Sequence, residues 1–203
     1  NAKWYMVVGS GPTGYDASVV QSAKVFVVDL ATGPGSGNSL VTSYSVGSWN
    51  SYIGDITAFD RDLDYRHDVV YFGRVIHDGA LPWRGKMYRL TMGAGGATAK
   101  FGTVTSPTQW GIASGSARVP TEMLDTFVSG AEMGPVATAP SITMDDAANV
   151  WVFAGSGRYY SGTDKTDVST QYFVGLKDSV LNAGCNQSAG ALNCMDNDLV
   201  DVS

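Results

Sequence analysis

The chain has 203 residues, of which 44% are hydrophobic and 16% charged, a balance typical of a globular domain rather than a disordered segment. Its net charge of −6 excludes the strongly basic surface on which nucleic-acid binding depends. No apolar run approaches the roughly 18 residues of a membrane-spanning helix, and we expect a mature or excised fragment with neither a membrane span nor a signal peptide.

The N-terminal segment, WYMVVGSGPTGYDASVVQSAKVFVVDL, carries a possible dinucleotide-binding fingerprint. Its first apolar run ends at Gly9, which opens a GxGxxG spacing, and Asp29 follows twenty residues later. A dinucleotide-binding unit also needs a helix between its two strands, but the intervening residues lack an apolar stripe at helical spacing. We therefore interpret the glycines as a turn at the end of a β-strand.

A three-fold repeat, whose first copy is this N-terminal segment, organises the chain. In each copy an apolar run ends in glycine, a polar loop follows, and a second aromatic-rich run begins 15, 13 or 16 residues after the glycine. The runs are short and rich in Val, Phe, Tyr and Trp, as strands are. Each unit predicts an antiparallel meander of three or four strands, the pattern of a β-propeller blade. The predicted blades occupy residues 1–33, 50–92 and 135–178.

Two segments fall outside this repeat. The irregular insertion 93–134 is rich in Gly, Ser and Thr, and we expect a strand near Phe101–Val104 and a short helix near Pro120–Phe127. The C-terminal tail, residues 179–203, contains the two cysteines, Cys185 and Cys194. Their spacing fits a disulfide-closed loop, which would indicate an oxidising compartment, and two unpaired thiols remain the alternative.

The second repeat contains an acidic loop, in the sequence AFDRDLDYRHDVVYFG. Asp60, Asp62, Asp64 and Asp68 occupy positions 1, 3, 5 and 9, and the backbone carbonyl of Arg66 occupies position 7. Oxygen ligands on alternate residues of a tight turn suit calcium, whereas magnesium keeps more water and zinc prefers softer ligands. The spacing therefore predicts a calcium site; the alternative is a solvated turn whose carboxylates do not converge.

The residues around this loop differ from those of an EF-hand, which has glycine at position 6, glutamate at position 12 and helices on both sides. Here Tyr65 and Tyr71 occupy those positions, and the loop leads directly into a predicted strand. We expect Asp55, on the preceding strand, to be a structural hydrogen-bonding group rather than a ligand. The corresponding pair in the third repeat, Asp145–Asp146, is predicted to form an ordinary turn.

Catalytic motifs are poorly represented. The chain has no GxSxG nucleophile motif. His67 falls within the acidic loop, and no candidate nucleophile is near His77 and Asp78, so we expect no enzymatic activity. No organic cofactor is predicted.

Three segments, FDRDLDYRHDVVYFG, WRGKMYRLTM and APSITMDDAANVWVFAGSGRYY, resemble the C-terminal propeller of the PilY family of type IV pilus biogenesis and tip-adhesin proteins. The resemblance covers nearly the whole chain, loosely at 93–134 and in the tail. It implies a quinoprotein-like propeller and a calcium loop that regulates pilus extension against retraction. It also implies a role in adhesion, at the bacterial cell surface or in a fimbrium, with pilins or a host or abiotic surface as partners. The ligands carried over are Asp60, Asp62, Asp64, Asp68 and the Arg66 carbonyl.

The sequence departs from this family in two respects. The segment RVIHDGALPWRG adds residues beside the acidic loop, and three blades are too few to close a propeller. We therefore expect the remaining blades to come from the rest of a longer protein or from another chain. The alternatives to a pilus-associated calcium module are a fragment of a quinoprotein-type dehydrogenase and a purely structural domain stapled by calcium.

Overall fold

The computed structural model describes residues 3–32, 39–47, 50–77, 79, 82–93, 106–124, 132–146 and 148–178. Over these residues the chain is built from antiparallel β-strands, with two short 3₁₀ helices, η1 (Pro107–Gln109) and η2 (Gly162–Thr166). The prediction of an all-β antiparallel fold is confirmed. None of the described helices is long and apolar enough to span a bilayer.

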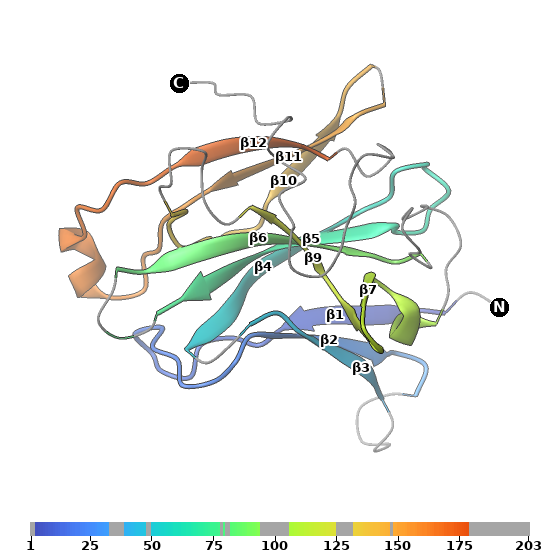
Figure 1. Cartoon of the computed structure of the whole chain (residues 1–203), viewed down its shortest axis with the longest axis horizontal. Helices are drawn as coiled ribbons and strands as arrows, with labels where there is room; N and C mark the ends of the chain where they lie inside the picture. The colour runs from blue at the N-terminus through green and yellow to red at the C-terminus, as the bar shows by residue number, and fades with distance from the viewer. Residues whose placement is uncertain are drawn as a thin grey trace.

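The strands form three main sheets and one small hairpin. The first sheet contains β1 (Tyr5–Gly9), β2 (Lys24–Asp29) and β3 (Leu40–Ser45). The second contains β4 (Ser51–Phe59), β5 (Val69–Ile76), β6 (Arg84–Thr91) and β9 (Thr121–Leu124). The third contains β10 (Ser141–Met144), β11 (Val150–Gly155) and β12 (Phe173–Asp178), and β7 (Ile112–Ser114) pairs with β8 (Ala117–Val119). Figure 1 shows the second sheet between the other two, and the described strands do not close into a ring.

Two large apolar cores hold this stack together, one on each face of the second sheet, and a smaller third cluster contains Tyr52 and Val75. Strand β5 explains why, because its alternate side chains enter different cores. Val70 and Phe72 pack with the first sheet, whereas Val69 and Tyr71 pack with the third. A strand covered on both faces has no polar side, so its sequence is the unbroken apolar run VVYF.

The glycine-rich segment after β1 is a turn region, as predicted. Strands β1 and β2 are antiparallel neighbours, and residues 10–23 between them form turns and bends instead of the helix of a dinucleotide-binding unit. Gly9 is required by packing, since a Cβ atom there would lie 2.4 Å from the Cβ of Ile53 in β4. The absence of a side chain lets β1 approach the second sheet.

Three details differ from expectation or were not anticipated. The predicted helix near Pro120–Phe127 is wrong, because Thr121–Leu124 forms β9 and pairs with β6. Hydrogen bonding to the edge of β6 and burial of Met123 and Leu124 outweigh the local helix propensity of this segment. The first sheet also gains β3, beyond the predicted boundary at residue 33. The strand expected near Phe101–Val104 and the cysteine pair lie outside the described residues.

The two terminal sheets each carry apolar side chains on the face turned away from the stack. In the first sheet, Met6 and Val8 of β1 and Leu40 of β3 are exposed. In the third, Phe173 is exposed and stacks on Phe153, with ring centroids 6.2 Å apart. In the part of the chain that the structure describes, no further sheet packs against these outer faces.

Candidate functional site

The acidic loop joins the two central strands, β4 and β5. Their last register pair is Phe59 with Val69, and the Asp68 N–H donates to the Phe59 carbonyl at 2.9 Å. Within the loop, Leu63 and Tyr65 have φ angles of 59° and 69°, the left-handed conformation that reverses the chain sharply. Tyr65 occupies the position that glycine fills in an EF-hand, so the same local conformation is reached here without glycine.

Three of the predicted aspartates converge. Carboxylate oxygens of Asp60, Asp62 and Asp68 all lie within 4.8 Å of one another. Asp64 is outside this cluster, and its Oδ1 accepts the Arg66 N–H at 2.9 Å. The ligand roles of Asp64 and of the Arg66 carbonyl therefore stay predictions.

Asp68 is the buried member of the cluster, with 5% of its surface exposed. Its Oδ2 accepts the Arg61 N–H at 2.8 Å. Burial raises the pKa of Asp68; the Arg61 amide opposes that rise, and the charges of Asp62 and Asp60 add to it. An ionised Asp68 thus gains from any positive charge placed near it.

Asp60 supplies a second indication that the cluster suits a cation. Its Oδ2 accepts the Tyr65 N–H at 2.8 Å, but its Oδ1 is buried and has no hydrogen-bond partner among the described atoms. A buried, unpartnered carboxylate oxygen is costly, and a metal ion would satisfy it. Several hard carboxylate oxygens fit calcium or magnesium by ligand type.

The loop also contacts the third sheet. The Arg61 side chain donates to the Ala148 carbonyl at 3.5 Å, in the turn between β10 and β11. The neighbouring Asp145 accepts hydrogen bonds from the Asn149 N–H at 2.9 Å and from the Trp151 indole at 3.1 Å. Asp145 is therefore a turn residue, as predicted, and its carboxylate is hydrogen-bonded within that turn and to the strand that follows.

The remaining candidate residues do not form a catalytic group within the described chain. His67 is exposed in the acidic loop, and the His77 ring stacks on Trp83 with centroids 4.1 Å apart. Asp78 lies outside the described residues. The expectation for the Asp55 side chain is wrong: it is exposed, and it makes no hydrogen bond or ion pair with any described residue. Its backbone N–H donates to the Ala137 carbonyl at 3.1 Å.

Sequence reasoning missed two buried ionic groups. Between the second and third sheets, Arg89 donates to Asp178, and the Tyr71 hydroxyl donates to the same carboxylate at 2.5 Å. At the far end of the stack from the acidic loop, Arg158 is paired with Asp164. The only sequence signal is a charged residue within or beside an apolar strand, which does not identify the partner.

Comparison with solved structures finds the same fold in the C-terminal domain of PilY1 from Pseudomonas aeruginosa. The similarity has a TM-score of 0.61 at 18% sequence identity, and it covers 95% of this chain and 37% of that one. The chain thus spans little more than a third of the length of the solved domain. At this level of identity the similarity shows a PilY1-like fold. No protein-family model and no curated protein sequence matches the chain.

Proposed function

We propose that this chain is a calcium-binding, non-enzymatic module of a type IV pilus-associated biogenesis or adhesion protein of the PilY kind. The observation that carries the metal site is the convergence of Asp60, Asp62 and Asp68, together with the buried Oδ1 of Asp60, which has no partner among the described atoms. The PilY1-like fold supports the pilus-related role, and with it a location outside the cell, at the outer membrane or in the fimbrium.

Calcium would act by ordering the acidic loop. Two carboxylates about 4 Å apart repel by roughly 4 kcal/mol at an effective dielectric of 20, so three of them favour an open loop when no ion is bound. The ion draws them together and fixes the residues between them. At the tip, Leu63 is exposed and Tyr65 is 98% exposed, so an ordered loop presents a rigid apolar contact.

This exposed tip connects the metal to a partner. A side chain that is already immobilised loses less conformational entropy on binding than a mobile one. Calcium would therefore increase the affinity of the loop for a pilin, or for a host or abiotic surface, without itself contacting the partner. A pull-down of purified pilin subunits with and without chelator tests this step. Equal recovery of pilin with and without chelator would instead favour a domain in which calcium has a purely structural role.

The three sheets would form blades of a larger, quinoprotein-like β-propeller. The exposed apolar residues on the outer faces of the first and third sheets support this arrangement, because each face resembles those that already form the two cores. Further blades, from the rest of a longer protein or from another chain, would cover them. A quinone-type absorbance band in the purified protein would favour the dehydrogenase alternative instead.

A further inference from the structure

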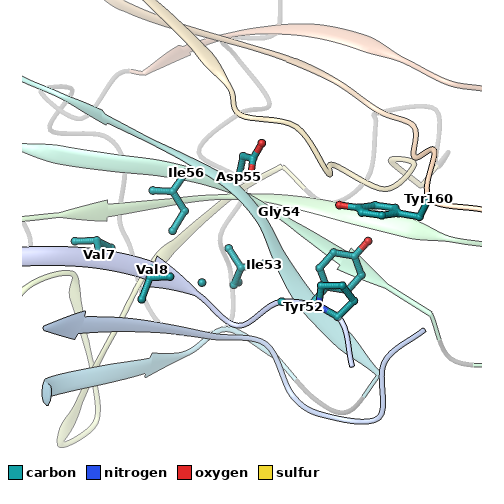
Figure 2. Close-up of a pocket in the computed structure, with 11 residues that line it drawn as sticks. Val7, Val8, Tyr52, Ile53, Gly54, Asp55, Ile56 and Tyr160 are labelled. Carbon is teal, nitrogen blue, oxygen red and sulfur yellow. The ribbon is translucent and has the colours of Figure 1, made fainter. Parts of the chain in front are cut away.

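Each of the three sheets has an inner edge, formed by its first strand, and an outer edge. The inner edges are β1, β4 and β10, and neighbouring ones are in contact. The Ile53 N–H of β4 donates to the carbonyl of Ser10, just after β1, at 2.9 Å. The Thr57 hydroxyl of β4 donates to the carbonyl of Pro140, just before β10, at 2.7 Å. Figure 2 shows the groove between β1 and β4, which Val8 and Ile53 line. The outer edges are β3, β9 and β12, and a further strand can pair there.

Strand β12 is the counterpart of β6 one repeat earlier. Gly73 of β5 corresponds to Gly155 of β11, and these glycines pair with Met87 of β6 and Phe173 of β12. On its outer side, β6 pairs with a fourth, antiparallel strand, β9. No described strand pairs with the outer side of β12 (Figure 1). Among the described strands, the third sheet therefore lacks the fourth strand that the second sheet has.

The hydrogen bonds of the third sheet show which backbone groups face this outer edge. The Ser156 N–H donates to the Tyr172 carbonyl at 2.7 Å, so the backbone of Tyr172 faces β11. Successive residues of an antiparallel strand direct their N–H and C=O groups to alternate sides. The backbone groups of Phe173, Gly175 and Lys177 therefore face outward, and the described residues supply no partner for them.

A fourth strand is not part of every repeat in this chain. In the first sheet β3 ends at Ser45 and β4 already begins at Ser51, which leaves too few residues for another strand between them. A three-stranded sheet is therefore a complete repeat here. An open strand edge is a template for pairing with another chain, and many proteins bind extended peptides in this way.

The side chains of β12 define which strand would fit. Val174 and Leu176 are buried in the core on one face. On the other face Phe173 is 67% exposed, and Lys177 makes no ion pair with any described residue. Gly175 lies between them, and the Phe153 ring covers it, since a Cβ atom there would lie 2.9 Å from that ring. An added antiparallel strand would place one residue beside Lys177 and the residue four positions later beside Phe173.

We propose that the outer edge of β12 binds an extended segment of a partner protein as an added antiparallel strand. Opposite charges and apolar pairs stabilise directly opposed positions of neighbouring strands. The segment therefore carries an acidic residue opposite Lys177 and an apolar or aromatic residue opposite Phe173. The two residues that flank its central position are apolar, because they lie on the same face as Val174 and Leu176. Binding at this edge uses no metal ion and is independent of the acidic loop.

Titration of the ¹⁵N-labelled full chain in chelator, followed by amide chemical shifts and hydrogen exchange, tests this proposal. The probe is the blocked peptide SEVTVFS, in which Glu and Phe occupy the two selected positions. We expect saturable shifts and slower exchange at the amides of Phe173, Gly175 and Lys177. The same peptide with an N-methyl group on its central Thr loses one backbone donor and should bind about tenfold more weakly. Equal binding of the two peptides would mean that no strand is added.

A charge exchange tests the register. Lys177→Glu should weaken binding of SEVTVFS about fivefold and should favour the peptide SKVTVFS, in which Lys replaces Glu. Restored binding of that second peptide shows that the variant is folded. Lys165→Glu, at an exposed lysine in η2, is the matched control and should keep the preference of the wild type. The proposal is overturned if no saturable shift occurs, if Lys177→Glu keeps the wild-type preference, or if the three amides are already protected before peptide is added, which would show an edge filled by this chain or by a second copy.

Discussion

The buried carboxylate of Asp68 accepts a hydrogen bond at 2.8 Å from the backbone of Arg61, and this contact joins the two ends of the acidic loop. The backbone of Asp68 is also fixed on both sides, because its N–H bonds to Phe59 at 2.9 Å and its carbonyl accepts from Met92 at 2.7 Å. One carboxylate of the cluster is therefore positioned by the sheet itself. Asp60 and Asp62 lie on the loop. An ion would stabilise the close approach of their carboxylates to the carboxylate of Asp68.

Replacing Asp68 by Asn should stabilise the calcium-free protein at pH 7. In the folded wild type, burial and the charges of Asp62 and Asp60 raise the pKa of Asp68 above its ordinary value of 3.8. The stability that Asp68 contributes is therefore present below pH 3.8 and is lost as the pH rises through the raised pKa of the folded state. The difference in unfolding free energy between Asp68→Asn and wild type, measured by urea denaturation in chelator, should grow from pH 3.5 to pH 7. A difference independent of pH would contradict this account of Asp68.

The buried group between the second and third sheets should be important for stability. The side chain of Asp178 is 2% exposed and is paired with Arg89 and Tyr71. Asp178→Asn leaves the Arg89 charge buried without its counter-ion and should cost about 3 kcal/mol. Tyr71→Phe removes one hydrogen bond and should cost about 1 kcal/mol. Urea unfolding of both variants measures these losses, and two equal losses would be inconsistent with an ionic role for Asp178.

Asp164 should make the protein sensitive to acid. Burial raises its pKa, but the Tyr160 and Ser161 N–H groups and the Arg158 side chain outweigh burial and hold the pKa below its ordinary value. Its stabilising contribution is then present above pH 3.8 and lost as the pH falls through the lowered folded pKa. Asp164→Asn should lower the unfolding free energy at pH 7. The variant should also lose less unfolding free energy than wild type between pH 4 and pH 2. An unchanged acid transition in this variant would argue against the prediction.

The exposed apolar faces of the terminal sheets should promote association of the isolated chain. Met6 and Phe173 lie on the outer faces of the first and third sheets. Exposed apolar patches are recurrent interaction sites, and the proposed propeller would cover these two with further blades. Sedimentation velocity should show concentration-dependent self-association of wild type and less association of the double variant Met6→Lys, Phe173→Lys. A wild-type chain that is monomeric at all concentrations would count against incomplete blades.

Local sequence patterns were sufficient to predict most of the strands and the position of the acidic loop. The run that forms β5 is apolar because the strand is covered on both faces, and the aspartate spacing in the loop is a short-range feature. By contrast, Thr121–Leu124 becomes a strand because the edge of β6 is available to it, and that edge belongs to a segment more than thirty residues earlier. Segments that pair over such distances are not determined by their own propensity.

The same limit applies to the site. Spacing predicted four converging aspartates, but it does not fix which direction each side chain takes once Leu63 and Tyr65 adopt left-handed backbone conformations. The structure brings three of them together and pairs Asp64 with the Arg66 amide. The exposed Asp55 lies where the register between β4 and β5 shifts, between Ile53 and Ile56, and no sequence motif indicated that shift.

Isothermal titration of calcium into the chelator-treated full chain tests the central claim most directly. We expect one saturable site in wild type, loss of measurable binding in Asp60→Asn and Asp68→Asn, and a smaller loss of affinity in Asp64→Asn, because the Asp64 carboxylate lies outside the cluster. Asp146→Asn, an exposed aspartate in another turn, is the matched control and should bind as wild type does. Calcium binding that is absent in wild type, or that persists unchanged in Asp60→Asn and Asp68→Asn, would contradict the assignment of the acidic loop as a calcium site.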